Sequence, residues 1–365
     1  MTTLDQSSAI DLARGLAALA VAAGHLRNHM LPDYKVVADP HLWFKIVAFF
    51  SGFGGQAVIV FFVLSGWLVG GALLSRRGQP NVLKHYAVDR ISRLWTVLVP
   101  VMALNFVLVT TGSDDSMKAQ IGLNLFIANL LGLQTIVAGT YGGNYPLWSL
   151  ANETAYYVLF PVCAIITTAL YRPLQRGFAA ALATVGLTAL LLLKPSIVVY
   201  FSIWLIGVAA SRIQLPHRIF WVIAPLFVCV CAAFRILRLD NNIAADALIA
   251  TAFAFMICSL PRSNNLPLRP RLAAVGGLLS SFSFTLYVIH VPLIFAIETR
   301  LPGFRSLSDP AMGLGAAVYA AFLVAILLVA FAFSRVTEAR TIQVRRILKR
   351  LMRLDPVNLP RISAH

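Results

Sequence analysis

The chain has 365 residues, with 30 Lys or Arg, 14 Asp or Glu and a formal net charge of +16. Apolar residues make up 59% of it and charged residues 12%, whereas soluble domains average about 25% charged residues. This composition excludes an ordinary water-soluble protein, because too few polar side chains remain to cover its surface. It predicts one all-α integral membrane domain.

Eleven apolar stretches approach the roughly 20 residues that a helix needs to cross a bilayer. The first has neither a basic segment before it nor a small-residue cleavage site after it, so we expect a retained helix rather than a signal peptide. In chain order the stretches are Ile10 to Met30, Gln56 to Leu74, Leu94 to Thr110, Ile121 to Val137, Trp148 to Leu170, Phe178 to Leu193, Ile197 to Ile213, Ile219 to Phe234, Ile243 to Leu260, Val275 to Ile297 and Ala311 to Ser334.

Basic residues occur in short clusters between these stretches, and they do not form the single basic face with interleaved aromatics that would indicate nucleic-acid binding. Lys and Arg near the ends of spans mark the cytoplasmic side of a membrane. The predicted loop at 75–93 is basic, and residues 335–353 hold seven Lys or Arg against one Glu. We therefore predict a transmembrane domain at 1–334 and a basic cytoplasmic tail at 335–365.

The charge pattern favours about ten crossings with both termini in the cytoplasm. If Ile121 to Val137 crossed, the basic cluster at 172–176 would lie outside, against the rule that such clusters stay inside. We therefore expect a re-entrant or non-crossing segment at 121–145. Non-helical backbone at membrane depth must be buried in protein or line a cavity, since lipid cannot satisfy its amides.

The first stretch carries two ionisable side chains, Arg14 and His25. Charges inside a span are costly, so each is a functional candidate. Eleven residues make just over three turns and rise about 16 Å, which puts both on one face and His25 about halfway across the bilayer. The alternative is that His25 bonds to a neighbouring helix and Arg14 reaches lipid phosphates. His29 follows His25 by four residues, but no third ligand accompanies them and we predict no metal site.

Glu153 stands at the start of the fifth stretch, where it either complements a helix N-terminus or faces the same cavity as His25. Tyr287 and His290 share a helix face near the end of the tenth stretch, where interfacial anchoring explains them as well as a site does.

Arg90 and Arg93 lie one helical turn apart in the basic loop before the third stretch. They either set the membrane topology or bind an anion with several phosphates. The small pair Ser65-Gly66 permits close contact between helices or approach of a ligand.

Five motifs in this order resemble the membrane-bound acyltransferase family 3, whose members O-acylate bacterial polysaccharides and related acceptors. They are Arg14 with His25, Phe61 to Gly66, Arg90 with Arg93, Pro146 to Glu153, and Phe282 to His290. The resemblance implies about ten membrane helices in the bacterial inner membrane. It also implies acyl-CoA, with acetyl-CoA as the first expectation, as a co-substrate rather than a permanently bound cofactor, and a carbohydrate or lipid-linked glycan as acceptor.

On that resemblance His25 carries catalysis as a general base or acyl relay, with Arg14 and Glu153 in support, and Arg90 and Arg93 bind the CoA phosphates. Glu338 fits the family pattern only loosely and is given no role. The remaining site candidates are Ser65, Trp148, Ser149, Tyr287 and His290.

Two other classes of function stay open. In a transporter or flippase, the intramembrane His, Glu and Arg would form a proton relay and the basic clusters would only set topology. In a scaffolding membrane subunit, replacing these residues would change stability without removing any chemical activity.

Overall fold

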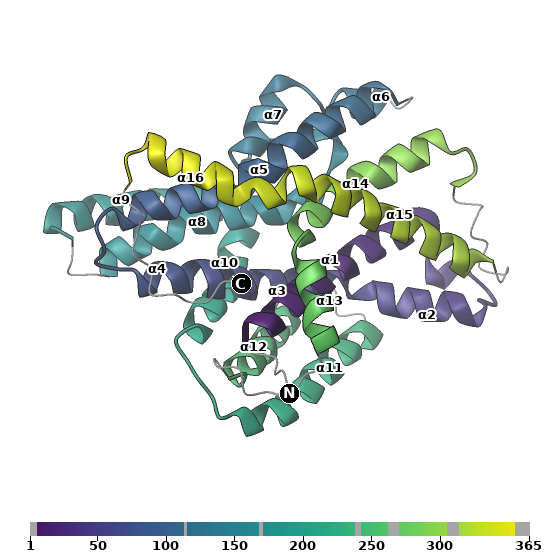
Figure 1. Cartoon of the computed structure of the whole chain (residues 1–365), viewed down its shortest axis with the longest axis horizontal. Helices are drawn as coiled ribbons and strands as arrows, with labels where there is room; N and C mark the ends of the chain where they lie inside the picture. Colours follow the sequence, from purple (N-terminus) through teal and green to yellow (C-terminus); the bar gives the residue numbers. More distant parts are fainter. Residues whose placement is uncertain are drawn as a thin grey trace.

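The computed structural model describes residues 6–112, 115–167, 171–237, 242–261, 270–304 and 314–354, and within these ranges it contains helices and no strand (Figure 1). This confirms the all-α prediction. The helices are α1 (Gln6–Met30), α2 (Leu42–Phe50), α3 (Gly54–Ser65), α4 (Gly71–Ser75), α5 (Val82–Thr110), α6 (Asp115–Lys118), α7 (Leu123–Leu130), α8 (Leu147–Thr167), α9 (Pro173–Leu193), α10 (Pro195–Ala210), α11 (Phe220–Leu237), α12 (Ile243–Cys258), α13 (Pro270–Ser280), α14 (Ser283–Arg300), α15 (Gly315–Val336) and α16 (Thr341–Leu351).

Seven helical stretches among the described residues are long and apolar enough to cross a membrane, and an eighth is added if α13 and α14 form one bent span. Two further apolar helices, α10 and α12, have 16 residues each and so rise about 24 Å, less than the roughly 30 Å of a hydrocarbon core. The chain is a multi-pass membrane protein, but the predicted count of about ten is not confirmed. The predicted span ends at 168–170 and 311–313 lie outside the described residues.

The segment 121–145, all of which is described, contains no spanning helix, as predicted. Its one α-helix, α7, has 8 residues and rises only about 12 Å. Beyond α7 the backbone turns irregularly, and Asn129 satisfies much of it. The Asn129 side chain donates to the carbonyls of Leu125 and Gly139 and accepts from the N–H of Tyr141. In Figure 1, α6 and α7 lie together at one edge of the molecule.

The predicted tenth span is not one helix. The chain breaks after Ser280, and α13 and α14 meet at a bend of 56°. A break leaves helix-end carbonyls and N–H groups without intrahelical partners. Arg14 supplies one partner, because its Nη2 donates to the Ser280 carbonyl across 3.1 Å. The same carbonyl also accepts from Ser283 Oγ at 3.0 Å. The break is therefore bridged both locally and by a charged side chain from α1, which is more than 260 residues away in the chain.

The basic segment before the third stretch also differs from the predicted loop. Helix α5 begins at Val82 and has 29 residues, about 44 Å, so it continues well past the bilayer core. Arg90 and Arg93 therefore stand on a rigid helix. The hydropathy of the sequence shows where the lipid-embedded part of a helix begins, here Leu94, but not where the helix itself begins, which is Val82.

Close packing of α3 against α10 depends on two glycines. A Cβ on Gly66 would clash with the carbonyl of Trp204, and one on Gly207 would clash with the carbonyl of Val63. Ser65, next to Gly66, accepts a hydrogen bond of 3.1 Å from the Trp204 indole N–H. The small pair thus allows helix contact, as one of its two sequence interpretations predicted.

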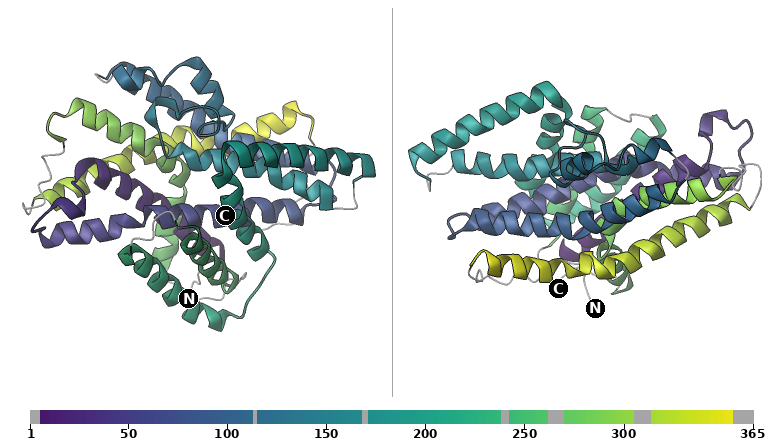
Figure 2. Two further views of the ribbon diagram at one scale, coloured as in Figure 1. Left: turned by 180° about the vertical axis from the view of Figure 1, so that it is seen from behind. Right: turned by 90° about the horizontal axis from the view of Figure 1, so that it is seen from above.

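The described part of the tail packs on the membrane domain. Helix α16 lies along α5, and Figure 2 shows α15 and α16, in yellow-green and yellow, along one side of the bundle. Asp89 on α5 holds α16 through Lys349 at 2.7 Å and Arg345 at 3.4 Å, and it also pairs with Arg76 at 3.4 Å. Residues 355–365 of the predicted tail lie outside the described residues.

Candidate active site

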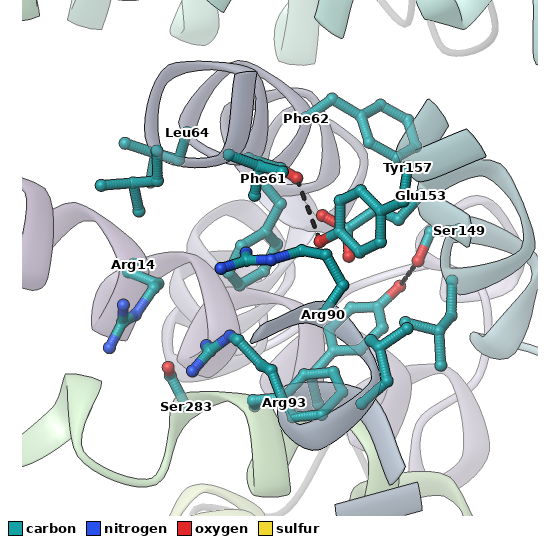
Figure 3. A pocket seen from close by; sticks show the side chains of 17 residues that line it. Arg14, Phe61, Phe62, Leu64, Arg90, Arg93, Ser149, Glu153, Tyr157 and Ser283 are labelled. Atoms are coloured by element: carbon teal, nitrogen blue, oxygen red, sulfur yellow. Dashed lines mark hydrogen bonds between the residues drawn. The ribbon is translucent and has the colours of Figure 1, made fainter. Parts of the chain in front are cut away.

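A cavity of about 110 Å³ lies between α1, α3, α5, α8 and α14 (Figure 3). It is lined by side chains from all five helices, and Figure 3 shows Arg14 from α1 and Arg90 and Arg93 from α5 reaching into one space. Three guanidiniums against one carboxylate leave an excess of positive charge, which suits an anionic ligand. The sequence-predicted residues that line it are Arg14, Ser65, Arg90, Arg93, Ser149, Glu153 and Tyr287.

Glu153 lies on the arginine side of this cavity. Its polar neighbours are the hydroxyls of Ser65 and Tyr157, and its charged neighbours are Arg90 and Arg93. The two hydroxyl oxygens are 3.4 Å apart. The carboxylate is therefore placed to balance and orient the arginines.

Aromatic faces hold both of the α5 arginines. The guanidinium carbon of Arg90 is 5.8 Å from the centre of the Tyr157 ring, and that of Arg93 is 5.5 Å from the Phe284 ring. Cation–π contact orients a guanidinium without using its N–H donors. The buried Nε of Arg90 makes no hydrogen bond within the described part of the chain, so it remains able to bind an anion.

Tyr287 forms the wall at the other side of the cavity. Its hydroxyl oxygen is 2.6 Å from Ser149 Oγ, and the hydroxyl donates to the carbonyl of Pro146 across 3.1 Å. The far side of this ring faces His290, with 6.0 Å between ring centres. Tyr287 therefore contacts both the cavity and His290.

His25 and His290 do not line the cavity. The His25 ring stacks on Tyr145, with 4.9 Å between centres and 14° between planes, and meets His290 nearly edge-on at 5.1 Å. The carbonyl of Leu286 accepts from His290 Nδ1 at 3.0 Å. Within the described residues, His25 Nδ1 and His290 Nε2 are buried without a hydrogen-bond partner. The His25 ring thus faces other functional side chains rather than lipid.

A second pair next to this cluster was missed by sequence reasoning. His29 Nδ1 lies 2.9 Å from Glu298 Oε2, and His29 Nε2 lies 3.4 Å from the Tyr145 hydroxyl. The spacing of His25 and His29 places both on one face of α1. Nothing in the sequence indicated that a carboxylate from α14 lies opposite His29.

Trp148 points away from the cavity that contains its neighbours in sequence. Its ring packs against Phe62 at 6.0 Å and Tyr200 at 6.2 Å. It lines a separate cavity that also includes Asp246. The structure therefore separates Trp148 from the arginines and histidines.

Glu338, which the sequence left without a role, holds the helix that carries Tyr287 and His290. Its Oε2 accepts from the backbone N–H of Thr285 at 2.9 Å and from the Thr285 hydroxyl at 3.0 Å. A carboxylate that accepts from first-turn N–H groups satisfies them and complements the helix dipole. Glu338 therefore fixes the start of α14.

A larger groove of about 370 Å³ adjoins the cavity between α5, the end of α7 and α8. Its lining is mostly apolar and includes Leu83, Trp95 and Val158. It shares Arg90, Leu94 and Tyr157 with the cavity, so these three side chains lie between the space that contains the arginines and the apolar groove.

Comparison with known proteins identifies the family. Residues 7–335 match the family described as an acyltransferase domain. A stretch of 126 residues is 29% identical to an uncharacterized protein of Haemophilus influenzae, and this match covers 32% of the chain and 51% of that protein. The chain thus spans about half the length of the curated relative it matches. No solved structure matches the chain. Because the family match covers nearly all of the membrane domain, the chain contains an acyltransferase domain and belongs to the membrane-bound acyltransferase family 3.

Proposed function

We propose that this enzyme, in the bacterial inner membrane with both termini in the cytoplasm, transfers an acyl group from acyl-CoA to a hydroxyl of a carbohydrate or lipid-linked glycan. Acetyl is the simplest donor group. The observation that carries the proposal is the cavity lined by Arg14, Arg90, Arg93 and Glu153, with Tyr287 as the lining residue that contacts His290. Within the described residues, one ring nitrogen of His290 and one of His25 have no hydrogen-bond partner. Family membership favours this chemistry over the transporter and scaffold alternatives.

The donor enters from the side of the arginines. CoA carries a diphosphate and a further phosphate, and guanidiniums bind such groups through paired N–H donors. Arg90 and Arg93 stand one turn apart on α5, and aromatic rings orient both. Phe61, Leu64 and Leu68 line the same cavity and would contact the less polar arm that carries the thioester.

Tyr287 stands between the donor and His25, so the thioester must pass this side chain to react. The hydroxyls of Tyr287 and Ser149, 2.6 Å apart, both have the Pro146 carbonyl as an acceptor. When the thioester arrives, one of these protons moves from Pro146 to the thioester carbonyl oxygen and stabilises the negative charge that develops on it. Beyond them His25 acts on the acyl group, either as general base or as a relay that is itself acylated.

Glu153 supports the reaction through the donor site. It contacts Ser65, Tyr157 and the arginines on the cavity side of Tyr287, whereas His25 packs with His290 and Tyr145 beyond it. We therefore assign Glu153 to orienting Arg90 and Arg93 rather than to fixing the tautomer of His25.

The test is single-turnover transfer from radiolabelled acetyl-CoA by purified protein, with a cell-envelope glycan fraction as acceptor. We expect release of CoA and label in the glycan, and loss of both in His25→Ala. His217, which contacts the Ser259 carbonyl away from this site, supplies the matched control His217→Gln. Label on the protein in the absence of acceptor would identify the relay. Normal transfer by His25→Ala would reject the role of His25, and no consumption of acetyl-CoA by the wild type would reject the proposed function.

A further inference from the structure

His29 and Glu298 form a carboxylate–histidine pair at the end of α1 farthest from Arg14. Fifteen residues separate Arg14 from His29, which corresponds to a rise of about 22 Å along the helix. His29 Nδ1 is 2.9 Å from Glu298 Oε2. The two side chains are 17% and 23% exposed, so a ligand can reach them without their being fully hydrated.

The pair has the arrangement of an oriented base. A carboxylate that accepts from Nδ1–H fixes the imidazole tautomer and leaves Nε2 as the proton acceptor. Burial, with a smaller contribution from Glu298, raises the pKa of Tyr145 to about 12. The Tyr145 hydroxyl is therefore protonated at neutral pH and can donate to His29 Nε2, 3.4 Å away. Phe295 packs edge-on against the imidazole at 5.1 Å.

The histidine assigned to the acyl group lacks such an orienting group. Within the described residues, His25 Nδ1 has no hydrogen-bond partner, and its ring contacts are Tyr145 and His290. His25 and His29 are one turn apart on one face of α1, so their side chains begin about 6 Å from each other. A group held between them can contact both imidazoles.

We propose that His29, oriented by Glu298, is the base that takes the proton from the acceptor hydroxyl, and that the acceptor binds at this end of the bundle over Tyr145. This inference rests on the proposed function and divides its chemistry between two histidines. His25 acts on the acyl group that arrives from the arginine side. His29 activates the hydroxyl that arrives from the opposite end.

The step balances without any additional reactant. The acceptor O–H bond breaks and its proton moves to His29 Nε2, while the oxygen forms a bond to the acyl carbonyl carbon. The bond from that carbon to the CoA sulfur breaks and the sulfur keeps the electron pair. If His25 is the relay, the carbon–nitrogen bond to His25 breaks instead. The proton on His29 then passes to the leaving sulfur or imidazole, so no net proton is released.

Tyr145 marks where the acceptor must lie. Its ring is roughly parallel to both imidazoles, at 14° to His25 and 19° to His29, with centres 4.9 Å and 6.4 Å away. It is 37% exposed and follows Gly142 and Gly143, which both have a positive φ. An exposed aromatic ring beside a carboxylate provides an apolar face and an acceptor for hydroxyl groups. A sugar or another polyol can pack its C–H groups on such a ring and donate its hydroxyls to the carboxylate.

The experiment compares two kinds of acceptor in the full-length protein with acetyl-CoA as donor. Glycerol, methyl glucoside and water need a base to become nucleophiles, whereas neutral hydroxylamine does not. We expect His29→Gln to lower transfer to the hydroxyl probes by about 100-fold or more, the usual contribution of a general base. Formation of acetohydroxamate from hydroxylamine by His29→Gln should stay close to the wild-type rate, after the rate measured without protein is subtracted.

Glu298 is a positioning residue, and its variants separate orientation from structure. Glu298→Gln should show the same split between the two acceptor types, and Glu298→Asp should recover part of the hydroxyl activity. His217→Gln should change neither reaction. Size-exclusion profiles and unfolding midpoints would show that each variant is folded.

Three results would overturn the inference while leaving the proposed function intact. In the first, His29→Gln and Glu298→Gln transfer acetyl to hydroxyl probes at the wild-type rate. In the second, these variants lose activity toward hydroxylamine to the same extent as activity toward the hydroxyl probes, which a purely structural pair would produce. In the third, the wild type acetylates hydroxylamine but no hydroxyl probe. If the wild type consumes no acetyl-CoA with any probe, the proposed function is rejected, and this inference is rejected with it.

Discussion

Arg14 donates a hydrogen bond to the backbone carbonyl of Ser280, at the point where α13 ends and α14 is about to begin. The same guanidinium nitrogen lies 3.2 Å from Ser280 Oγ and 3.7 Å from Asp11 Oδ1. The arginine of the first motif therefore has a structural partner two residues before the last motif. Its charge faces the donor cavity, and its donors complete a broken helix.

The first prediction concerns this hydrogen bond. Arg14→Ala should reduce the free energy of unfolding by about 1 to 3 kcal/mol, because the Ser280 carbonyl loses its charged donor and keeps only the hydrogen bond of 3.0 Å from Ser283 Oγ. Ser280→Ala is the matched control, since it keeps the carbonyl bond and removes only the hydroxyl, which accepts from Arg14 and donates to Asp11 Oδ1 across 2.9 Å. Unfolding in detergent followed by circular dichroism would measure both. Equal stability of the two variants would show that the carbonyl does not depend on Arg14.

The second prediction concerns the carboxylate at the start of α14. Glu338→Ala should cost about 1 kcal/mol, as loss of a helix cap does, and should speed amide exchange in residues 283–290. Because α14 carries Tyr287 and His290, acyl transfer should fall as well. Thr285→Val removes the hydroxyl bond of 3.0 Å but keeps the backbone bond of 2.9 Å, and it should have the smaller effect. Unchanged exchange in Glu338→Ala would contradict the cap.

The third prediction separates the phosphates of the donor from its acyl group. Arg90→Ala and Arg93→Ala should each raise KM for acetyl-CoA about tenfold or more, since one charge-assisted hydrogen bond contributes about 1.5 to 3 kcal/mol. KM for S-acetylpantetheine, which has no phosphate, should stay at the wild-type value. Arg172→Ala, at an exposed N-cap position, is the control. An equal rise in KM for both donors would remove the arginines from phosphate binding.

The fourth prediction concerns the docking of α16 by Asp89. Asp89→Asn keeps the shape of the side chain and removes the charge that Arg76, Arg345 and Lys349 share. A network of partly exposed ion pairs of this kind should contribute about 1 to 2 kcal/mol, so amide exchange in residues 341–351 should accelerate. Asp115→Asn, which breaks an exposed pair with Lys118, should leave that region unchanged. Wild-type protection of α16 in Asp89→Asn would show that apolar contacts alone hold it.

Helical spacing predicted part of the cavity lining, because it states which side chains share a face. His25, which one interpretation placed in the same cavity as Glu153, is not among the lining residues. Arg90 and Arg93 are one turn apart and both reach the cavity, and Ser149 and Glu153 do so from α8. Trp148 stands one residue before Ser149, and this shift of about 100° around the helix points it elsewhere. A motif names neighbours in sequence, but only the helix rotation decides which of them face a ligand.

Partners across helices could not be predicted in the same way. The cost of placing Glu298 or His29 in an apolar helix shows that a charge needs a partner, but it does not identify the partner or its direction. The bend between α13 and α14 could not be predicted for a related reason. Serines are nearly neutral in hydropathy, so the mean hydropathy of a span stays high across a break that contains them.

The capping role of Glu338 has a consequence for truncated forms. The family match ends at residue 335, and all the side chains that line the cavity come before that point. A protein cut at residue 337 would contain the full set of cavity residues yet lack the anchor for α14. Its inactivity would then reflect a loosened scaffold, so a deletion series alone could not separate the residues that react from the one that keeps them aligned.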